Sequence, residues 1–285
     1  MDLHFTKMQG CGNDFIVIDD PMSEWDFDES AVQLLCDRHF GVGADGIILV
    51  RPATDPAADF FMLYHNADGS LAEMCGNGIR VFARFLMETG RVALDAIEVQ
   101  TLGGIKHVET TRDEDGRFVS ARVDMGEPVL AAVDIPTTLA GDPVLDAPIV
   151  TELGDVRVTC VSMGNPHAII WVDDVDSAPV TTLGPLVEVD AAFPRKTNVE
   201  FAQVVGVDRI RLRVWERGVG ETLACGTGAC ATLVAAALTG RTGRVATIEL
   251  PGGDLEIEWS ETGRVIMTGP AETVFEGALV VPDEE

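Results

Sequence analysis

Two cysteines, Cys75 and Cys225, each stand in a Cys-Gly-x-Gly motif directly before an apolar stretch, as CGNGIRVFARF and CGTGACATLVAA. A helix that begins there leaves its first amides unpaired and carries roughly half a positive charge at its N-terminus. Glycine lets a ligand approach those amides closely, and the field favours a thiolate. The motifs therefore predict two carboxylate-binding helix N-termini, each beside a thiol base. The amides concerned belong to Gly76, Asn77, Gly226 and Thr227.

The chain repeats itself at an offset of 150 to 152 residues. Residues 66–78 align with 216–228 without a gap, residues 12–20 resemble 164–174, and residues 44–50 resemble 197–204. Three matched segments in the same order indicate two copies of one domain. If the copies face each other about a pseudo-two-fold axis, both helix N-termini point into one cleft. Two thiols on opposite sides of one carbon suit removal of a proton from one face and its return on the other.

Hydrophobic periodicity predicts helices over 28–39, 76–89 and 226–239, and short β-branched or aromatic runs predict strands between them. The Pro-, Gly- and Asp-rich stretch near 126–146 predicts the domain boundary. We therefore expect an N-terminal half over 1–126 and a C-terminal half over 127–270. Residues 271–285 are expected to return to the first half as a strand.

Other polar residues in the repeated segments fit an amino-acid ligand. Arg217 is suited to bind a second carboxylate bidentately, and Glu216 an ammonium group. His167 could pair with a thiol. Four asparagines lie near glycines at predicted strand–loop junctions, where they would serve specificity: Asn13, Asn66, Asn165 and Asn198. The spacing of the six cysteines matches no zinc ribbon or finger, so no metal is expected, and the other four are expected to be inert.

The charge balance limits the partners. The chain has 47 acidic and 20 basic residues, a formal net charge of −27. Nucleic acid and anionic membranes carry the same sign and are not expected to bind. No apolar run has the length of a membrane span and the N-terminus lacks the order of a secretory signal, so the expected compartment is the cytoplasm. Because the acids are scattered, we expect a surface adapted to high salt.

Five segments carry a resemblance to a known family: MQGCGNDFIVID, NADGSLAEMCGNGIRVFARF, MGNPH, TNVEF and WERGVGETLACGTGACA. Together they closely resemble diaminopimelate epimerase, over nearly the whole chain. The resemblance implies an α/β (α+β) fold of two similar pseudo-symmetric domains, each a mixed β-sheet wrapped around a central helix, with the active site in the cleft between them. It implies interconversion of L,L- and meso-diaminopimelate in lysine biosynthesis, with no cofactor, by a protein that is often a homodimer.

The same resemblance assigns roles to individual residues. Cys75 and Cys225 are the acid/base pair, and Gly76, Asn77, Gly226 and Thr227 hold the reacting carboxylate. The substrate-binding set also contains Asn13, Asn66, Asn165, Asn198, Glu216 and Arg217, and His167 and Glu216 tune a thiol. One position departs from the family. Many members carry glutamine where this chain has Gly46, so no side-chain contact can come from there, and a water or a neighbour is expected to fill the gap.

Three other functions stay open on the residues alone. The chain could be a racemase or epimerase of another amino acid such as proline, although Arg217 and the asparagines favour a substrate with a second charged end. It could be a dithiol redox protein, against which the absence of C-x-x-C and the glycines argue. It could also bind a carboxylate without catalysis, which predicts binding without hydrogen exchange.

Overall fold

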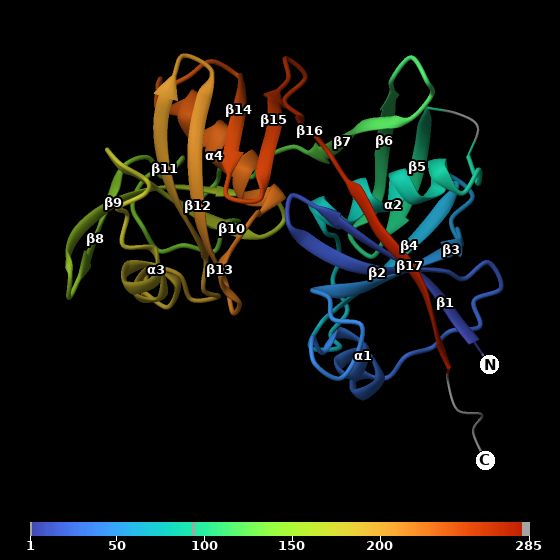
Figure 1. Ribbon diagram of the computed structural model, residues 1–285. Coiled ribbons are helices and arrows are strands. Elements are labelled where there is room, and N and C mark those ends of the chain that lie inside the picture. Colours follow the sequence, from blue (N-terminus) through green and yellow to red (C-terminus); the bar gives the residue numbers. More distant parts are fainter. Residues whose placement is uncertain (1, 93–94, 281–285) are drawn as a thin grey trace. The chain divides into compact units, whose positions relative to one another are not determined.

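The chain folds into two compact units in the computed structural model, which describes residues 2–92 and 95–280. Unit 1 consists of residues 1–123 and 269–285, and unit 2 of residues 124–268. The chain thus returns to unit 1 with its last strand, β17 (Glu272–Val280). That strand pairs antiparallel with β1 (Asp2–Gly10), and the two cross the lower part of unit 1 in red and dark blue (Figure 1). The rest of the expected returning strand lies outside the described residues.

Unit 1 is a mixed sheet that packs around one helix. Its strands pair in the order β17–β1–β2–β3–β4–β5–β6–β7, with β2–β3 and β4–β5 parallel and the other pairs antiparallel. Helix α2 packs against β1, β2, β3, β4 and β6. The remaining elements are β2 (Asn13–Asp19), α1 (Glu29–Cys36), β3 (Gly46–Pro52), β4 (Phe60–Asn66), α2 (Gly76–Glu88), β5 (Ala96–Thr101), β6 (Gly104–Arg112) and β7 (Phe118–Gly126), whose last residues fall in unit 2.

Unit 2 has the same plan around helix α4, which packs against β9, β10, β11, β14 and β15. Here β10–β11 and β12–β14 are the parallel pairs. The elements are β8 (Ala147–Thr151), β9 (Gly154–Ser162), β10 (Pro166–Trp171), α3 (Val180–Glu188), β11 (Asn198–Gly206), β12 (Arg209–Glu216), β13 (Gly220–Thr222), α4 (Gly226–Leu238), β14 (Val245–Leu250), β15 (Gly253–Trp259) and β16 (Val265–Gly269).

The repeat in the sequence is a repeat in the fold. The order β1–β2–β3–β4–β5–β6 recurs as β9–β10–β11–β12–β14–β15, with the same sequence of parallel and antiparallel pairs. Even the register agrees, because Phe15 stands opposite Gly46 as His167 stands opposite Asn198. The predicted fold class, two similar domains each with a mixed sheet around a central helix, is confirmed.

Four elements of the structure are not predicted from the sequence: β1, β8, β13 and α3. Helix α3 begins after Pro179 and contains Pro185, a residue that disfavours a helix interior. It forms because Leu183 and Val187 pack into a hydrophobic cluster with β9, β10 and β11. Tertiary packing thus overrides local propensity here. In the two described ranges, none of the helices has the length and apolarity to cross a membrane.

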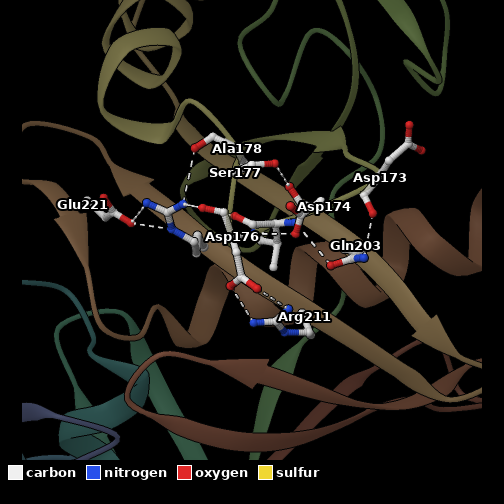
Figure 2. A network of polar contacts seen from close by, with 10 residues as sticks. Asp173, Asp174, Asp176, Ser177, Ala178, Gln203, Arg211 and Glu221 are labelled. Carbon is white, nitrogen blue, oxygen red and sulfur yellow. Dashed lines mark hydrogen bonds and ion pairs between the residues drawn. The ribbon is translucent and has the colours of Figure 1, made fainter.

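A polar network fixes the segment between β10 and α3 to the sheet of unit 2 (Figure 2). Gln203 donates to the Asp173 carbonyl at 2.7 Å, and Arg211 forms two hydrogen bonds of 2.7 and 2.9 Å to Asp176. The guanidinium of Arg213 donates at 3.1 to 3.3 Å to three backbone carbonyls, those of Val175, Asp176 and Ala178. The acidic run DDVD at 173–176 therefore belongs to a structural turn.

Candidate active site

Cys75 is the N-cap residue of α2, so the helix begins directly after the thiol. Its backbone is extended, with φ −135° and ψ 118°, and its sulfur accepts a hydrogen bond from the Gly78 amide at 3.3 Å. A Cβ on Gly78 would lie 3.3 Å from Cδ1 of Ile48 and 3.4 Å from the Cys75 sulfur. The second glycine of the motif therefore lets the first turn pack on β3 while the half-buried thiol stays beside it.

Asn13 joins the Cys75 thiol to a polar network at the start of β2. Its Oδ1 lies 3.8 Å from the Cys75 sulfur and accepts from Nδ2 of Asn77 at 3.3 Å. Its Nδ2 donates to Asp45 at 2.7 Å, and Asp45 is held in turn by Arg38 at 2.8 Å. Because a carboxylate only accepts, the Asn13 amide has a defined orientation, with its oxygen toward the thiol.

Arg80 is a buried cation that sequence reasoning treated as part of a core stretch. It lies one turn into α2, and its guanidinium donates to the Gly76 carbonyl at 2.8 Å, to Oδ1 of Asn77 at 3.0 Å and to the Pro270 carbonyl at 3.0 Å. Arg80 therefore fixes the start of α2 and orients the Asn77 amide. The signal that could have found it is an arginine inside the apolar run IRVF, close to the cysteine motif.

The position of Gly46 is filled by a neighbour. A Cβ there would lie 2.4 Å from the His65 carbonyl oxygen, 2.5 Å from Cε2 of Tyr64 and 2.9 Å from its hydroxyl oxygen. The phenol of Tyr64 thus occupies the space that a side chain at 46 would take. Opposite Gly46, Asn66 ends β4 and donates from Nδ2 to the Ser70 hydroxyl at 3.0 Å.

Cys225 is the equivalent N-cap residue of α4, but its surroundings differ. Cys225 is only 6% exposed, and its sulfur is 3.5 Å from the Thr227 hydroxyl oxygen. Burial raises the pKa of the Cys225 thiol well above its usual value, and the charges of Glu216 and Glu200 raise it further. The expectation that the helix N-terminus lowers this pKa is wrong for Cys225, because desolvation and two carboxylates outweigh the helix field.

His167 forms a buried pair with Glu200, and neither side chain is exposed to solvent. Its Nδ1 lies 2.6 Å from Oε1 of Glu200, and its Nε2 lies 3.0 Å from Oδ1 of Asn165. Both ring nitrogens of His167 therefore lie within hydrogen-bond distance of an oxygen atom. Sequence reasoning missed Glu200. The signal was an acid within the apolar strand NVEFAQV, which the repeat aligns with an apolar residue of GIILV.

Asn198 and Arg217 are joined at the edge of unit 2. The Asn198 amide donates to the Pro166 carbonyl at 2.8 Å and accepts from the backbone amide of Arg217 at 2.9 Å. The Arg217 side chain is exposed and donates to the Arg195 carbonyl at 3.2 Å. Asn198 thus positions the backbone at Arg217. Burial raises the pKa of Glu216, although the Thr222 hydroxyl donates to its carboxylate at 2.5 Å.

Each unit therefore gathers its own part of the predicted residues. In unit 1 the structure brings Asn13, Asn77 and Cys75 into contact, with Gly76 in the first turn of α2. In unit 2 it brings together two groups, Cys225 with Glu216 and Thr227, and His167 with Asn165. Each unit thus sets a thiol, a helix N-terminus and polar side chains together. Such an arrangement can bind a carboxylate and transfer a proton through sulfur.

Comparison with known proteins agrees with this geometry. The family model of diaminopimelate epimerase matches residues 5–131 and 159–274. The chain is 52% identical to diaminopimelate epimerase of Pelotomaculum thermopropionicum over 278 residues, 96% of this chain and 98% of that protein. It is 52% identical to that of Synechocystis sp. over 281 residues, 97% and 99% of the two chains.

Among solved structures, the chain is similar to a probable proline racemase from Agrobacterium radiobacter K84. The TM-score is 0.72 at 16% identity, over 98% of this chain and 93% of that one. A hydroxyproline epimerase from Agrobacterium vitis has a TM-score of 0.71 at 17% identity, over 98% and 91%. At these identities the likeness concerns the fold. The family model and the close relatives show that the chain belongs to the diaminopimelate epimerase family.

Proposed function

We propose that this chain is an isomerase that interconverts L,L- and meso-diaminopimelate, in lysine biosynthesis, by transferring a proton through two thiols. The observation that carries the proposal is the pair of cysteine-capped helices at equivalent places of a duplicated fold. Membership of the diaminopimelate epimerase family supports the substrate. The reaction needs one thiol for each face of the α-carbon, and the duplication supplies two.

In the proposed mechanism one cysteine starts as thiolate and the other as thiol. The thiolate takes the α-proton, the thiol gives its proton to the opposite face, and the two sulfurs have then exchanged states. This requires both Cys75 and Cys225 to contact the same substrate molecule. The burial of Cys225 and its two neighbouring carboxylates support the thiol form of that residue before substrate binds.

The α-proton of an amino acid is a very weak acid, so the carbanion that forms needs electrostatic support. We propose that the reacting carboxylate lies against the first amides of the two helices, where the helix fields stabilise the added negative charge. Those amides belong to Gly76, Asn77, Gly226 and Thr227, which begin α2 and α4.

The rest of the proposed binding set recognises the amino groups and the distal carboxylate. The exposed guanidinium of Arg217 is suited to the distal carboxylate, and the carboxylate of Glu216 to an ammonium group. The amides of the set can donate or accept as the substrate requires. They are Asn13, Asn66, Asn165 and Asn198.

The test is incubation with L,L-diaminopimelate in D2O at high KCl, following the isomer ratio and α-deuteration. Wild type should form the meso isomer and incorporate deuterium, and Cys75→Ala or Cys225→Ala should lower the rate by about 10²-fold or more. The matched control is Cys36→Ala, a buried cysteine of α1 that should keep the wild-type rate. Epimerisation by the Cys75→Ala/Cys225→Ala double variant would overturn the proposal. Racemisation of proline in place of diaminopimelate turnover would favour the alternative amino acid.

A further inference from the structure

The two equivalent helices rest on different side chains. Ile48 stands opposite Tyr64 in β3–β4, as Glu200 stands opposite Val214 in β11–β12. A Cβ on Gly78 of α2 would lie 3.3 Å from Cδ1 of Ile48, whereas a Cβ on Gly228 of α4 would lie 2.7 Å from Oε1 of Glu200. Unit 2 therefore has a carboxylate where unit 1 has an aliphatic side chain.

The residue beside that position on the adjacent strand is likewise apolar in unit 1 and polar in unit 2. Phe15 in β2 and His167 in β10 occupy the same register, and both are fully buried. Unit 1 thus has the apolar residues Phe15 and Ile48 beneath its helix. Unit 2 has His167 and Glu200, whose nitrogen and oxygen are 2.6 Å apart.

Glu200 reaches the first turn of α4 beside the thiol. The absent Cβ of Gly228 would be 2.7 Å from Oε1 of Glu200 and also 3.3 Å from the Cys225 sulfur, so carboxylate and sulfur are neighbours. The second oxygen, Oε2, is buried and has no hydrogen-bond partner within the described part of the chain. A buried carboxylate is costly where a hydrophobic residue would pack, as Ile48 does in unit 1. Its presence therefore points to a function.

Other titratable and apolar side chains also lie around α4 and the Cys225 thiol. The charge of Glu216 in β12 raises the pKa of Cys225, and the Thr227 hydroxyl oxygen is 3.5 Å from the sulfur. On β9, burial and the charge of Glu200 raise the pKa of Cys160 to about 12. The fully buried residues of β14 and β15 include Ile248, Leu255 and Ile257, which carry no charge.

We propose that Glu200, oriented by the buried ring of His167, keeps the Cys225 sulfur in its thiol form until substrate binds. The imidazole N–H stabilises the Glu200 carboxylate, and that negative charge disfavours a second one on the nearby sulfur. The pair acts through Cys225, so both are positioning residues. The two equivalent thiols are thereby unequal before any ligand arrives. This effect on the thiol rests on the contacts alone, and its role in turnover rests on the proposed function.

The test is Glu200→Gln, with the alkylation rate of each cysteine by iodoacetamide measured against pH by peptide mass spectrometry. Removing one nearby negative charge should raise the labelling rate of Cys225 at fixed pH by about tenfold or more. The rate of Cys75 should stay unchanged, which makes it the internal control. Glu200→Asp, which keeps the charge, should behave as wild type. Ile48→Val, the matched control in unit 1, should change neither rate.

A second variant tests the same inference if Glu200→Gln does not fold. His167→Phe with Glu200→Ile copies the apolar pair of unit 1 and removes the charge together with its buried partner, so that only the half-buried Asn165 loses a contact. This variant should also raise the Cys225 rate. If a variant that lacks the Glu200 carboxylate folds and the alkylation rate of its Cys225 is unchanged, the inference is wrong. The labelling does not require turnover. Absence of epimerisation in the wild type would therefore reject the proposed function, and the labelling rates would still test this inference.

Discussion

At the scale of single residues, the six cysteines differ through their surroundings. Burial raises the pKa of Cys36 to about 11, and burial with the charge of Glu200 raises that of Cys160 to about 12. Cys75 is half-buried at the N-terminus of a helix. The thiolate is the reactive form, so a raised pKa lowers reactivity at every pH below it. These values agree with the expectation that Cys36 and Cys160 are inert.

This predicts selective alkylation of the native protein at about pH 8. The thiolate fractions of Cys36 and Cys160 there are about 10⁻³ and 10⁻⁴, so Cys75 should react before either of them. Their rates should rise with pH up to the region of their raised pKa. Timed iodoacetamide labelling with peptide mass spectrometry measures this, and labelling in urea shows the intrinsic rates. Equal native rates for Cys36 and Cys75 would contradict the assignment.

At the scale of elements, the sequence predicts the first residues of α2 and α4 correctly. It does not predict the contacts that hold the turn at 173–178. The motifs predict helices from 76 and from 226, and α2 and α4 begin at those residues. The acids at 173–176, by contrast, are among the scattered acids from which the sequence predicts a salt-adapted surface. The structure ties this segment to Arg213 and Arg211, which lie more than thirty residues further along the chain.

Replacement of Arg213 by alanine should destabilise unit 2. Three carbonyls of the 173–178 turn lose charge-assisted hydrogen bonds, at a cost of about 2 to 3 kcal/mol in the free energy of unfolding. Arg211→Ala is the matched control, since its pair with Asp176 lies at the surface and should matter less. Urea denaturation compares the two. Equal loss of stability in both variants would show that the carbonyl contacts contribute little.

At the scale of the whole molecule, charge dominates. At most 20 of the 47 acids can have a basic partner of their own, which leaves a large excess of negative charge. Repulsion among exposed charges destabilises a compact state, and salt screens it. The surface ion pairs that the structure does contain, such as Arg117 with Asp115, contribute little individually.

We therefore predict that thermal stability rises with KCl. Raising the concentration from about 0.1 M to about 1 M shortens the Debye length from about 10 Å to about 3 Å, and Tm should increase by several degrees. Differential scanning calorimetry measures it. Sucrose at matched osmolality stabilises proteins by exclusion without screening charge, so its effect should be smaller. A Tm independent of KCl would remove the case for a salt-adapted surface.

The duplication and the two cysteine-capped helices can be predicted from the sequence, because they depend on residue types at short spacings and on their recurrence. The same motifs carry the resemblance to the family, which the comparisons confirm. Only the tertiary structure showed that Tyr64 fills the space over Gly46, that Arg80 fixes the start of α2, and that Glu200 and His167 lie beneath Cys225. Contacts of this kind join residues from different strands and helices. Burial and charge at such contacts decide the pKa of Cys225, and a local motif contains neither.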